Sequence, residues 1–227
     1  MKKILLIVFL ILAFASGGFA FWLTSRYTVP ILMYHSVGYG QGSFFVSPQS
    51  FFKQMDYLKK NGYQVISLDE LVEDIRKQKP PKRRQVGITF DDGYQNNFQY
   101  AYPILKKFGF PATIFVITYL VGTGGADKGM EFASWDQILL MSKNGIAIGS
   151  HSKTHYNFDG QMDEKKALAE LLDSKKIIEG KMKKFYEENA LLEQVYMFDE
   201  EGKTLVKDIV ADYNKKKGIT AKVESFV

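Results

Sequence analysis

The sequence contains no cysteine, which excludes disulfide bonds and metal sites built from thiolates. Histidine is also scarce, with three residues in a chain of 227. A metal site in this chain would have to rely on imidazole nitrogens and carboxylate oxygens, the usual ligands of zinc and similar ions. No nucleic-acid-binding motif is present, and we expect no nucleic-acid partner. The net charge of +5 is a mild basic excess that fits work near anionic wall polymers or lipid headgroups.

One stretch, residues 85–93, reads as a buried strand that ends in two carboxylates and a glycine. Neighbouring strand residues point to opposite faces, so Asp91 and Asp92 can be aimed differently. One of them could hold a cation while the other accepts a proton. Asp-Asp-Gly is also good turn chemistry, so these residues alone leave a simple turn as an open interpretation.

A second strand-like stretch, residues 146–155, ends in a His-x-x-x-His pair formed by His151 and His155. Together with one carboxylate, the pair would supply three protein ligands and leave a position open for water, as a catalytic metal site requires. A lone histidine is more often structural. A His pair after one strand and an Asp pair after another are a more specific signal, and they indicate a divalent-metal site.

These two motifs resemble those of the polysaccharide deacetylase family, also called the NodB-homology or carbohydrate esterase 4 family. Thr89–Gly93 is similar to the first family motif and His151–His155 to the second. The resemblance runs from about Pro30 to about Lys184, and Ile31–Val37 is similar to the start of the branch that deacetylates poly-β-1,6-N-acetylglucosamine. It implies an α/β fold of the irregular (β/α) barrel type.

The resemblance also implies a role for each of five residues. Asp92, His151 and His155 would bind a divalent cation, with zinc as the expected metal. Asp91 would be the general base, and His35 would be the general acid that protonates the leaving amine. His35 can also be read as a structural histidine, and both interpretations stay open at this point.

The third motif of the family, which supplies a groove wall with a proline and an aromatic residue, is missing. From Tyr156 to Val227 the sequence has no arginine, proline or histidine, and beyond about residue 185 it diverges from the family. We therefore expect turnover to be slow or absent, with metal affinity much less affected. Three functions fit: N-deacetylation of a GlcNAc-containing polysaccharide, non-catalytic glycan binding at the membrane, and amide or ester hydrolysis of a smaller substrate.

The first 26 residues are expected to target the chain to the membrane. Lys2 and Lys3 precede a charge-free run from Ile4 to Ser25. About 20 apolar residues can cross a bilayer, and leading lysines keep the N-terminus in the cytoplasm. The alternative is a signal peptide that is cleaved after export. Either way we expect residues 27–227 to form one deacetylase-like catalytic domain outside the membrane, anchored by a single span or secreted.

Local signals predict a parallel βα arrangement. Glycines at 62, 109, 145 and 218 each close a helix and open a strand. In such folds the chemistry gathers at the carboxyl ends of the strands, where His35, Asp91, Asp92 and His151 fall. Strands are expected at 28–37, at 63–68, within 85–93, and at 112–116, 146–149, 192–198 and 220–223. Helices are expected at 48–61, 94–108 and 202–217, and a further helix capped by Ser134 carries Trp135, Ile138, Leu139 and Met141. Two more helices are expected at 69–79, with Leu71, Val72 and Ile75 inward, and at 163–185, with Leu168, Leu171, Ile177 and Ile178 inward.

Overall fold

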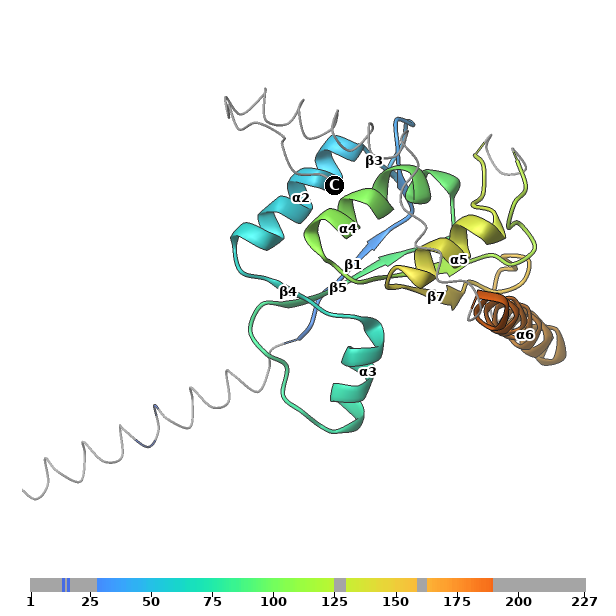
Figure 1. Cartoon of the computed structure of the whole chain (residues 1–227). Helices are drawn as coiled ribbons and strands as arrows, with labels where there is room; N and C mark the ends of the chain where they lie inside the picture. The colour runs from blue at the N-terminus through green and yellow to red at the C-terminus, as the bar shows by residue number, and fades with distance from the viewer. Residues whose placement is uncertain (1–13, 15, 17–27, 125–129, 159–162, 190–227) are drawn as a thin grey trace, which may run out of the picture.

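The protein is described by a computed structural model that places residues 14, 16, 28–124, 130–158 and 163–189 (Figure 1). The expected targeting segment, apart from Phe14 and Ser16, lies outside the described residues, as do the elements expected at 192–198, 202–217 and 220–223. Those expectations stay predictions. Within the described part of the chain, no helix combines the length and the apolar character that a membrane span requires.

Strand β5 (Gln85–Phe90) lies at the centre of a parallel sheet, and all six of its residues are buried. It pairs with β1 (Ile31–Tyr34) along one edge and with β6 (Ala112–Val116) along the other, and β7 (Ile146–Ser150) follows β6. The short strand β4 (Gln64–Val65) pairs with the start of β5. Buried apolar strands are typical of parallel sheets covered by helices, so the βα arrangement predicted from the sequence is confirmed.

Among the described residues this sheet is open, with β1 and β7 as its outer members on the main path. Closure into the irregular barrel that the resemblance implies would need strands outside these residues. The described part therefore has the α/β character that was expected, and the closed barrel stays a prediction.

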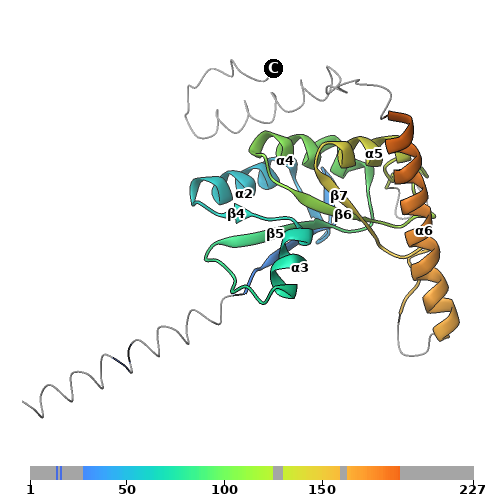
Figure 2. The same ribbon diagram turned by 60° about the horizontal axis from the view of Figure 1, so that its bottom comes forward.

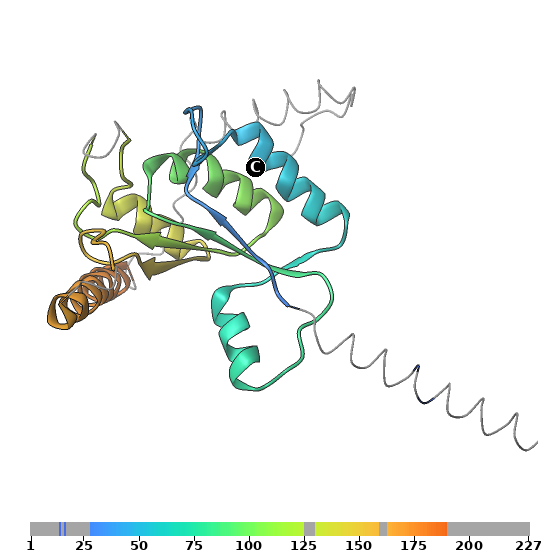
Figure 3. The same ribbon diagram turned by 180° about the vertical axis from the view of Figure 1, so that it is seen from behind.

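Three helices cover one face of the sheet: α2 (Pro48–Lys60), α4 (Tyr102–Phe108) and α5 (Trp135–Lys143) (Figures 1 and 3). A longer helix, α6 (Glu164–Asn189), stands beside β7 at the edge of the sheet (Figure 2). The side chains between the three helices and the strands are almost completely excluded from water. They form one continuous core that includes Phe51, Met55, Ile88, Phe90, Ile104, Ile114, Ile138 and Met141.

The predicted starts of two helices, at residue 48 and after Ser134, are confirmed by their caps, whereas the helix predicted at 69–79 ends three residues early, at Arg76. The Ser47 hydroxyl accepts a hydrogen bond from Ser50 N at 3.2 Å at the start of α2. At the start of α5, Ser134 and Gln137 form a reciprocal capping box. Just past three helix ends the predicted glycines adopt positive φ, as the helix–glycine–strand pattern requires: 67° at Gly62, 66° at Gly109 and 90° at Gly145.

The expected first strand, 28–37, is wrong as a single element. The chain leaves the sheet at His35, and β2 (Ser36–Val37) pairs with β3 (Phe45–Val46) in a separate two-stranded sheet. The buried Asn97 side chain explains the break. Its amide donates to His35 O at 2.8 Å, and its carbonyl accepts from Val37 N at 3.1 Å. Such bonds take backbone groups that a continued strand would offer to its neighbour.

The strand expected at 63–68 is also too long. It is reduced to β4, because the hydroxyl of Ser67 accepts a hydrogen bond from Glu70 N at 3.0 Å and begins helix α3 (Leu68–Arg76). A serine in extended conformation that caps a helix ends the strand before it.

The helix expected at 94–108 begins later and is not uniform. Tyr94 instead forms an isolated bridge with Phe132, and a π-helical turn, η1 (Asn97–Ala101), precedes α4. Pro103 lies in the first turn of α4 and has no N–H to offer to the preceding turn. Because a proline cannot donate the usual hydrogen bond to the preceding turn, it is compatible with a wider, π-helical turn at that place.

Helix α3 does not bury the apolar stripe that the sequence predicts to face inward. Val72 is 44% exposed, Ile75 is 65% exposed, and no residue of the helix is buried. The helix lies on the opposite side of the sheet from α2 and α4 (Figures 1 and 3). An amphipathic sequence reports which side is apolar, but it does not supply an element to cover that side.

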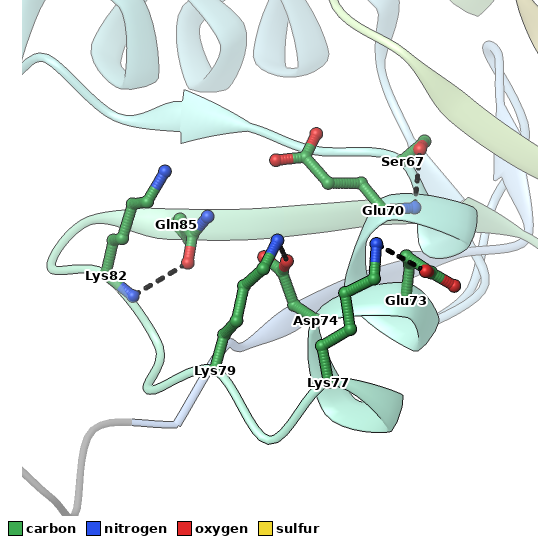
Figure 4. A network of polar contacts seen from close by, with 8 residues as sticks. All are labelled: Ser67, Glu70, Glu73, Asp74, Lys77, Lys79, Lys82 and Gln85. Carbon is green, nitrogen blue, oxygen red and sulfur yellow. Dashed lines mark hydrogen bonds and ion pairs between the residues drawn. The ribbon is translucent and has the colours of Figure 1, made fainter.

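Polar contacts at the surface hold α3 and the turn that follows it (Figure 4). Lys79 Nζ lies 2.8 Å from Asp74 Oδ1, and Lys82 N donates to Gln85 Oε1 at 2.8 Å. Exposed ion pairs of this kind contribute little to stability. Helix α3 is therefore the most weakly anchored of the described helices that flank the sheet.

Helix α6 turns a different face to the sheet than the sequence predicts. Leu168 and Leu171, expected to face inward, are 55% and 50% exposed. The buried row consists of Glu170, Ser174 and Ile178, which are spaced four residues apart. Only Ile178 of the expected residues is buried, and the inward face of this helix is largely polar.

Candidate functional site

The predicted site residues lie just after the carboxyl ends of three strands. His35 follows β1, Asp91 and Asp92 follow β5, and His151 follows β7. Because these strands are parallel, their carboxyl ends meet at one edge of the sheet. The backbone N–H of Asp91 donates to Tyr34 O at 2.9 Å, which joins the end of β5 to the end of β1.

Asp92, His151 and His155 form a group that could hold a divalent cation. Asp92 Oδ1 lies 3.3 Å from Nε2 of His151 and 3.6 Å from Nε2 of His155, and one ligand atom from each residue lies within 4.8 Å of the others. Ligands about 2.1 Å from a shared tetrahedral ion would be roughly 3.4 Å apart. Asp92 Oδ1 is buried without a hydrogen-bond donor among the described residues, and a cation would satisfy it. The three residues therefore fit such an ion.

The turn after β5 holds Asp92 in an unusual backbone conformation. The φ angle is 70° at Asp92 and 79° at Gly93, in the left-handed region that side-chain-bearing residues rarely adopt. A Cβ on Gly93 would lie 2.9 Å from Cγ1 of Val116 in β6. The backbone of the turn is also held by Ala133 N, which donates to Gly93 O at 3.0 Å. Strain of this kind persists only where the surroundings fix it, and it concentrates at functional sites.

We expect Gly93→Ala to lower the free energy of unfolding by about 1–3 kcal/mol, because the new Cβ meets Val116 and alanine disfavours positive φ. Metal affinity should fall with it, since the same turn aims Asp92. Denaturant unfolding and calorimetric zinc titration measure the two effects. Gly180→Ala in α6 is the matched control, because nothing lies near its Cβ position and the change should stabilise by about 0.5–1 kcal/mol. An unchanged unfolding midpoint for Gly93→Ala would contradict the role given to this turn.

The loop that carries His151 and His155 is fixed by its own hydrogen bonds and by a neighbouring segment. The hydroxyl of Ser152 accepts from His155 N at 3.0 Å. Lys153 O accepts from Tyr119 N at 2.9 Å, just beyond β6. Both Ser152 and His155 have positive φ angles, 64° and 62°. The two imidazoles are thus presented by a short, strained loop, as Asp92 is.

Glu170 of α6 anchors this loop, and reasoning from the sequence missed it. Its carboxylate accepts three hydrogen bonds, from Lys153 N at 3.0 Å, Thr154 N at 2.7 Å and the Thr154 hydroxyl at 2.8 Å. Burial opposes ionisation of the carboxyl, but the hydrogen bonds from Thr154 and Lys153 outweigh it and lower the pKa of Glu170. The sequence does place Glu170 on the same helix face as Ser174 and Ile178, at a spacing of four residues. This face was not recognised as the buried one, because the leucine face was predicted to point inward.

We expect Glu170→Ala to weaken metal binding by about ten- to hundredfold, since the loop bearing both histidines loses three hydrogen bonds. Glu170→Gln keeps a carbonyl acceptor and should lose less. Calorimetric titration with zinc measures the effect, alongside the unfolding midpoint of the metal-free variants. Glu179→Gln is the matched control on the same helix, because Glu179 is 64% exposed and takes part in a surface ion pair with Lys175. Zinc affinity in Glu170→Ala equal to that of the original chain would show that Glu170 does not position the site.

Asp92 is held in its ionised form. Burial opposes ionisation, but the contact with His151, the charge of His155 and a hydrogen bond from Tyr94 together lower the pKa of Asp92. The contact with Asp92 in turn raises the pKa of His151. Tyr94 is a further site residue that was not identified from the sequence. It directly follows the Asp-Asp-Gly turn, and that position was the available signal.

Asp91 and His35 lie beside this group. Burial raises the pKa of Asp91, and the nearby charges of His151 and then His35 partly offset the rise. The buried Asn97 fixes the backbone that directly follows His35, at His35 O and Val37 N, and the centre of the imidazole ring lies 5.2 Å from the centre of the Phe44 ring. Two adjacent carboxyls whose pKa values move in opposite directions are suited to different tasks.

The structure thus brings the three predicted ligands together and places Asp91 and His35 next to them. Metal binding by the ligands, and proton transfer by Asp91 and His35, stay predictions. The segment that would have to replace a third family motif, residues 190–227, lies outside the described residues.

Two family descriptions match this chain. Polysaccharide deacetylase matches residues 78–187, slightly less than half of the chain, and this range includes Asp91, Asp92, His151 and His155. Elongation factor TS matches residues 149–227. The second match overlaps the first over residues 149–187, and residues 190–227 of it lie outside the described part of the chain. Only the first match contains both the Asp pair and the His pair.

Individual proteins agree with the first match. YxkH of Bacillus subtilis (strain 168), whose name classes it with the polysaccharide deacetylases, is 38% identical over 151 residues, which cover 66% of this chain and 51% of YxkH. Poly-beta-1,6-N-acetyl-D-glucosamine N-deacetylase of Staphylococcus aureus (strain MSSA476) is 37% identical over 101 residues, which cover 44% of this chain and 34% of that enzyme. The chain thus spans about half or less of the length of these curated relatives.

A solved structure gives the same result for the fold. The Streptococcus pyogenes deacetylase PplD in complex with acetate superposes with a TM-score of 0.62 at 25% sequence identity, covering 83% of this chain and 81% of that chain. The likeness shows a deacetylase-type α/β fold, as the sequence motifs predicted.

Proposed function

We propose that this chain, with its polysaccharide deacetylase domain, is a metal-dependent hydrolase that removes N-acetyl groups from a GlcNAc-containing polysaccharide. One observation carries the proposal: the Asp92–His151–His155 group at the strand ends, with Asp91 and His35 beside it. Poly-β-1,6-N-acetylglucosamine is the proposed polymer, because the Staphylococcus aureus relative is named for it. Chitin and peptidoglycan are the comparison substrates.

Asp92, His151 and His155 would hold the cation, and two imidazoles with one carboxylate favour zinc. When bound, such an ion supplies Lewis-acid chemistry, which polarises a carbonyl group and makes water easier to deprotonate. The residues themselves supply position and charge. Asp92 stays anionic through its contacts with His151 and Tyr94, and Glu170 holds the loop that aims the two histidines.

Asp91 and His35 would move the protons of the hydrolysis. Asp91 accepts a proton from the attacking water, and its raised pKa makes it a stronger base than an ordinary aspartate. His35 donates a proton to the amine nitrogen as the C–N bond breaks, so that acetate and a free amino sugar leave. Asn97 keeps the backbone at His35 in place through two hydrogen bonds.

We also propose that residues 1–227 by themselves turn the substrate over slowly. From Tyr156 onward the sequence has no arginine, proline or histidine with which to build the third family motif. In the family that motif supplies a groove wall and an oxyanion donor, and loss of one such donor costs about 3 kcal/mol in the transition state. Metal affinity should be much less affected, because it depends on the three ligands and the groups that hold them.

The test is acetate release from poly-β-1,6-N-acetylglucosamine, chitin and peptidoglycan, with and without added zinc. Zinc-dependent release from the first polymer, slow compared with a relative that has the third motif, is the expected result. No release from any of the three polymers at saturating zinc would overturn the proposal. Release only from a small N- or O-acetyl substrate would identify an amidohydrolase or esterase.

A second candidate is a membrane-anchored glycan-binding protein that keeps the metal site without catalysis. The same missing arginine, proline and histidine residues favour it. Glycan and zinc binding without detectable acetate release would separate this candidate from a slow enzyme.

We propose that residues 1–26 carry the domain out of the cytoplasm. The support is the charge-free run after Lys2 and Lys3. Cell fractionation should find the full-length chain in the membrane, with residues 27–227 open to protease from outside. A soluble secreted form that starts near residue 16 or 21 would show that the segment is a cleaved signal peptide, and a full-length cytosolic protein would contradict both readings.

A further inference from the structure

A hollow of about 670 Å³ opens beside the candidate active site. It lies between the loop that leads to β3 and the segment from Tyr94 into η1. Two of its lining residues contact the site directly. The Phe44 ring lies 5.2 Å from the His35 ring, and Tyr94 hydrogen-bonds to Asp92. A ligand bound in this hollow would therefore lie next to His35 and Asp92, and so next to the sugar residue that is deacetylated.

Aromatic rings and amides dominate the lining. Tyr39 is 64% exposed and Phe44 is 52% exposed, although both are large side chains. Tyr39 is supported edge-on by Tyr100, with ring centroids 5.6 Å apart, and by a hydrogen bond from Gln49 Nε2 to its hydroxyl at 2.8 Å. Braced, exposed rings at the rim of a hollow offer an apolar face to a ligand. Amides that can pair with hydroxyl groups come from Gln41, Gln95, Asn96 and Gln99.

Asn96 provides a further sign of a ligand. Its Nδ2 donates to the Ser36 hydroxyl at 2.6 Å, but its Oδ1 is buried without a hydrogen-bond partner among the described residues. A buried amide oxygen left unpaired costs free energy, so a donor on a ligand or a water is expected there. Sugar hydroxyl and amine groups are such donors.

The charge of the hollow selects among sugars. Glu131 is the one charged side chain among its described lining residues, and no lysine or arginine is among them. This contrasts with the net charge of +5 on the whole chain. The segment that carries Glu131 is tied to the hollow by the bond from Gln95 N to Glu131 O at 2.9 Å. A carboxylate next to exposed aromatic rings favours a cation and disfavours another carboxylate.

We propose that this hollow is a subsite for a glucosamine residue with a free, protonated amine, adjacent to the GlcNAc residue that is deacetylated. The inference rests on the proposed function for its place in the polymer. It adds that the chain prefers a partly deacetylated strand of poly-GlcNAc. Fully acetylated strands bind more weakly, and glycans with carboxylate-bearing sugars, as in peptidoglycan, bind least.

The test uses the full chain with Asp91→Asn, so that oligomers are bound and not consumed. Calorimetric titration at about pH 6, where a free amine is protonated, compares three oligomers of equal length. One is fully acetylated, one is partly deacetylated, and one contains carboxylate-bearing sugars. We expect the partly deacetylated oligomer to bind most tightly and the carboxylate-bearing one least.

Two variants locate the binding. Glu131→Gln should lower the affinity for the partly deacetylated oligomer by about two- to fivefold, as expected for loss of an exposed ionic contact. The affinity for the fully acetylated oligomer should stay unchanged. Tyr39→Ala should lower the affinity for both of these oligomers by roughly three- to tenfold, because the aromatic face that packs against the sugar is lost. The matched controls are Glu164→Gln at the start of α6 and Tyr57→Ala on α2. Both residues are exposed and lie outside the hollow, and both changes should have no effect.

The outcomes separate this inference from the proposed function. If Glu131→Gln and Tyr39→Ala bind all oligomers like the parent while acetate is released from poly-GlcNAc, the subsite is wrong and the function stands. If the oligomers bind in the expected order but no polymer releases acetate, the subsite is supported and the proposed deacetylase function is wrong. Equal binding of the carboxylate-bearing and partly deacetylated oligomers, or binding of none, would overturn the inference.

Discussion

Replacing His151 by alanine is expected to remove most of the bound metal and to leave the fold intact. The side chain is one of three ligands, and its loss leaves the buried Asp92 Oδ1 facing His155 alone. Loss of a residue that only supports a ligand costs about ten- to hundredfold in metal affinity, so loss of a ligand should cost more than hundredfold. The fold should survive, because the His151 side chain is 32% exposed and fills no part of the core.

Elemental analysis of the purified chain and calorimetric zinc titration measure the result. The chain supplies its own matched control, because its third histidine is His35. His35→Ala should keep full zinc stoichiometry while acetate release falls. Full stoichiometry at unchanged affinity in His151→Ala would mean that the ligand set is misassigned. Loss of zinc in His35→Ala would mean that the site extends to β1.

The sequence predicted most of the sheet and the location of the site for specific physical reasons. The strand at 112–116 was found at its observed limits, and the strand predicted within 85–93 is observed at Gln85–Phe90, since short apolar runs between turn signals are typical of buried parallel strands. The starts of α2 and α5 follow from Ser47 and Ser134, whose hydroxyls cap the first turn. The metal group followed from two motifs at strand ends, because parallel strands bring their carboxyl ends together.

The errors concern which face of an element is covered, and here the sequence pattern carries less information. In α6 the leucines form an apolar row, but the helix turns Glu170 and Ser174 toward the sheet, because the histidine loop offers donors to Glu170 and the Ser150 hydroxyl of β7 donates to Ser174. A pairing between a carboxylate and backbone N–H groups leaves no mark on hydrophobic periodicity. Asn97 is a similar case, since a buried asparagine that ends β1 reads as an ordinary residue in a helix.

Replacing Asp91 by asparagine is expected to reduce turnover by about a hundred- to ten-thousandfold and to leave zinc affinity within a few-fold of the parent. Asparagine has nearly the same shape and keeps the backbone bond from Asp91 N to Tyr34 O, but it cannot accept the proton of the attacking water. Stability should be unchanged or slightly higher at neutral pH. Burial raises the pKa of Asp91 above its unfolded value, so the ionised carboxylate disfavours the folded state as pH rises through that range. Asparagine removes this charge.

Asp92→Asn is the matched control, because it makes the same chemical change one residue away, on a proposed ligand. Asp92→Asn should lose zinc and turnover together, whereas Asp91→Asn should lose turnover alone. Acetate release at saturating zinc, zinc affinity and the unfolding midpoint together distinguish the two. Loss of zinc in Asp91→Asn would make Asp91 a ligand and leave the general base unassigned. Near-normal turnover in Asp91→Asn, with zinc bound, would show that the proton of the attacking water goes to another group, and His35 would then be the residue to examine, since its charge reaches Asp91.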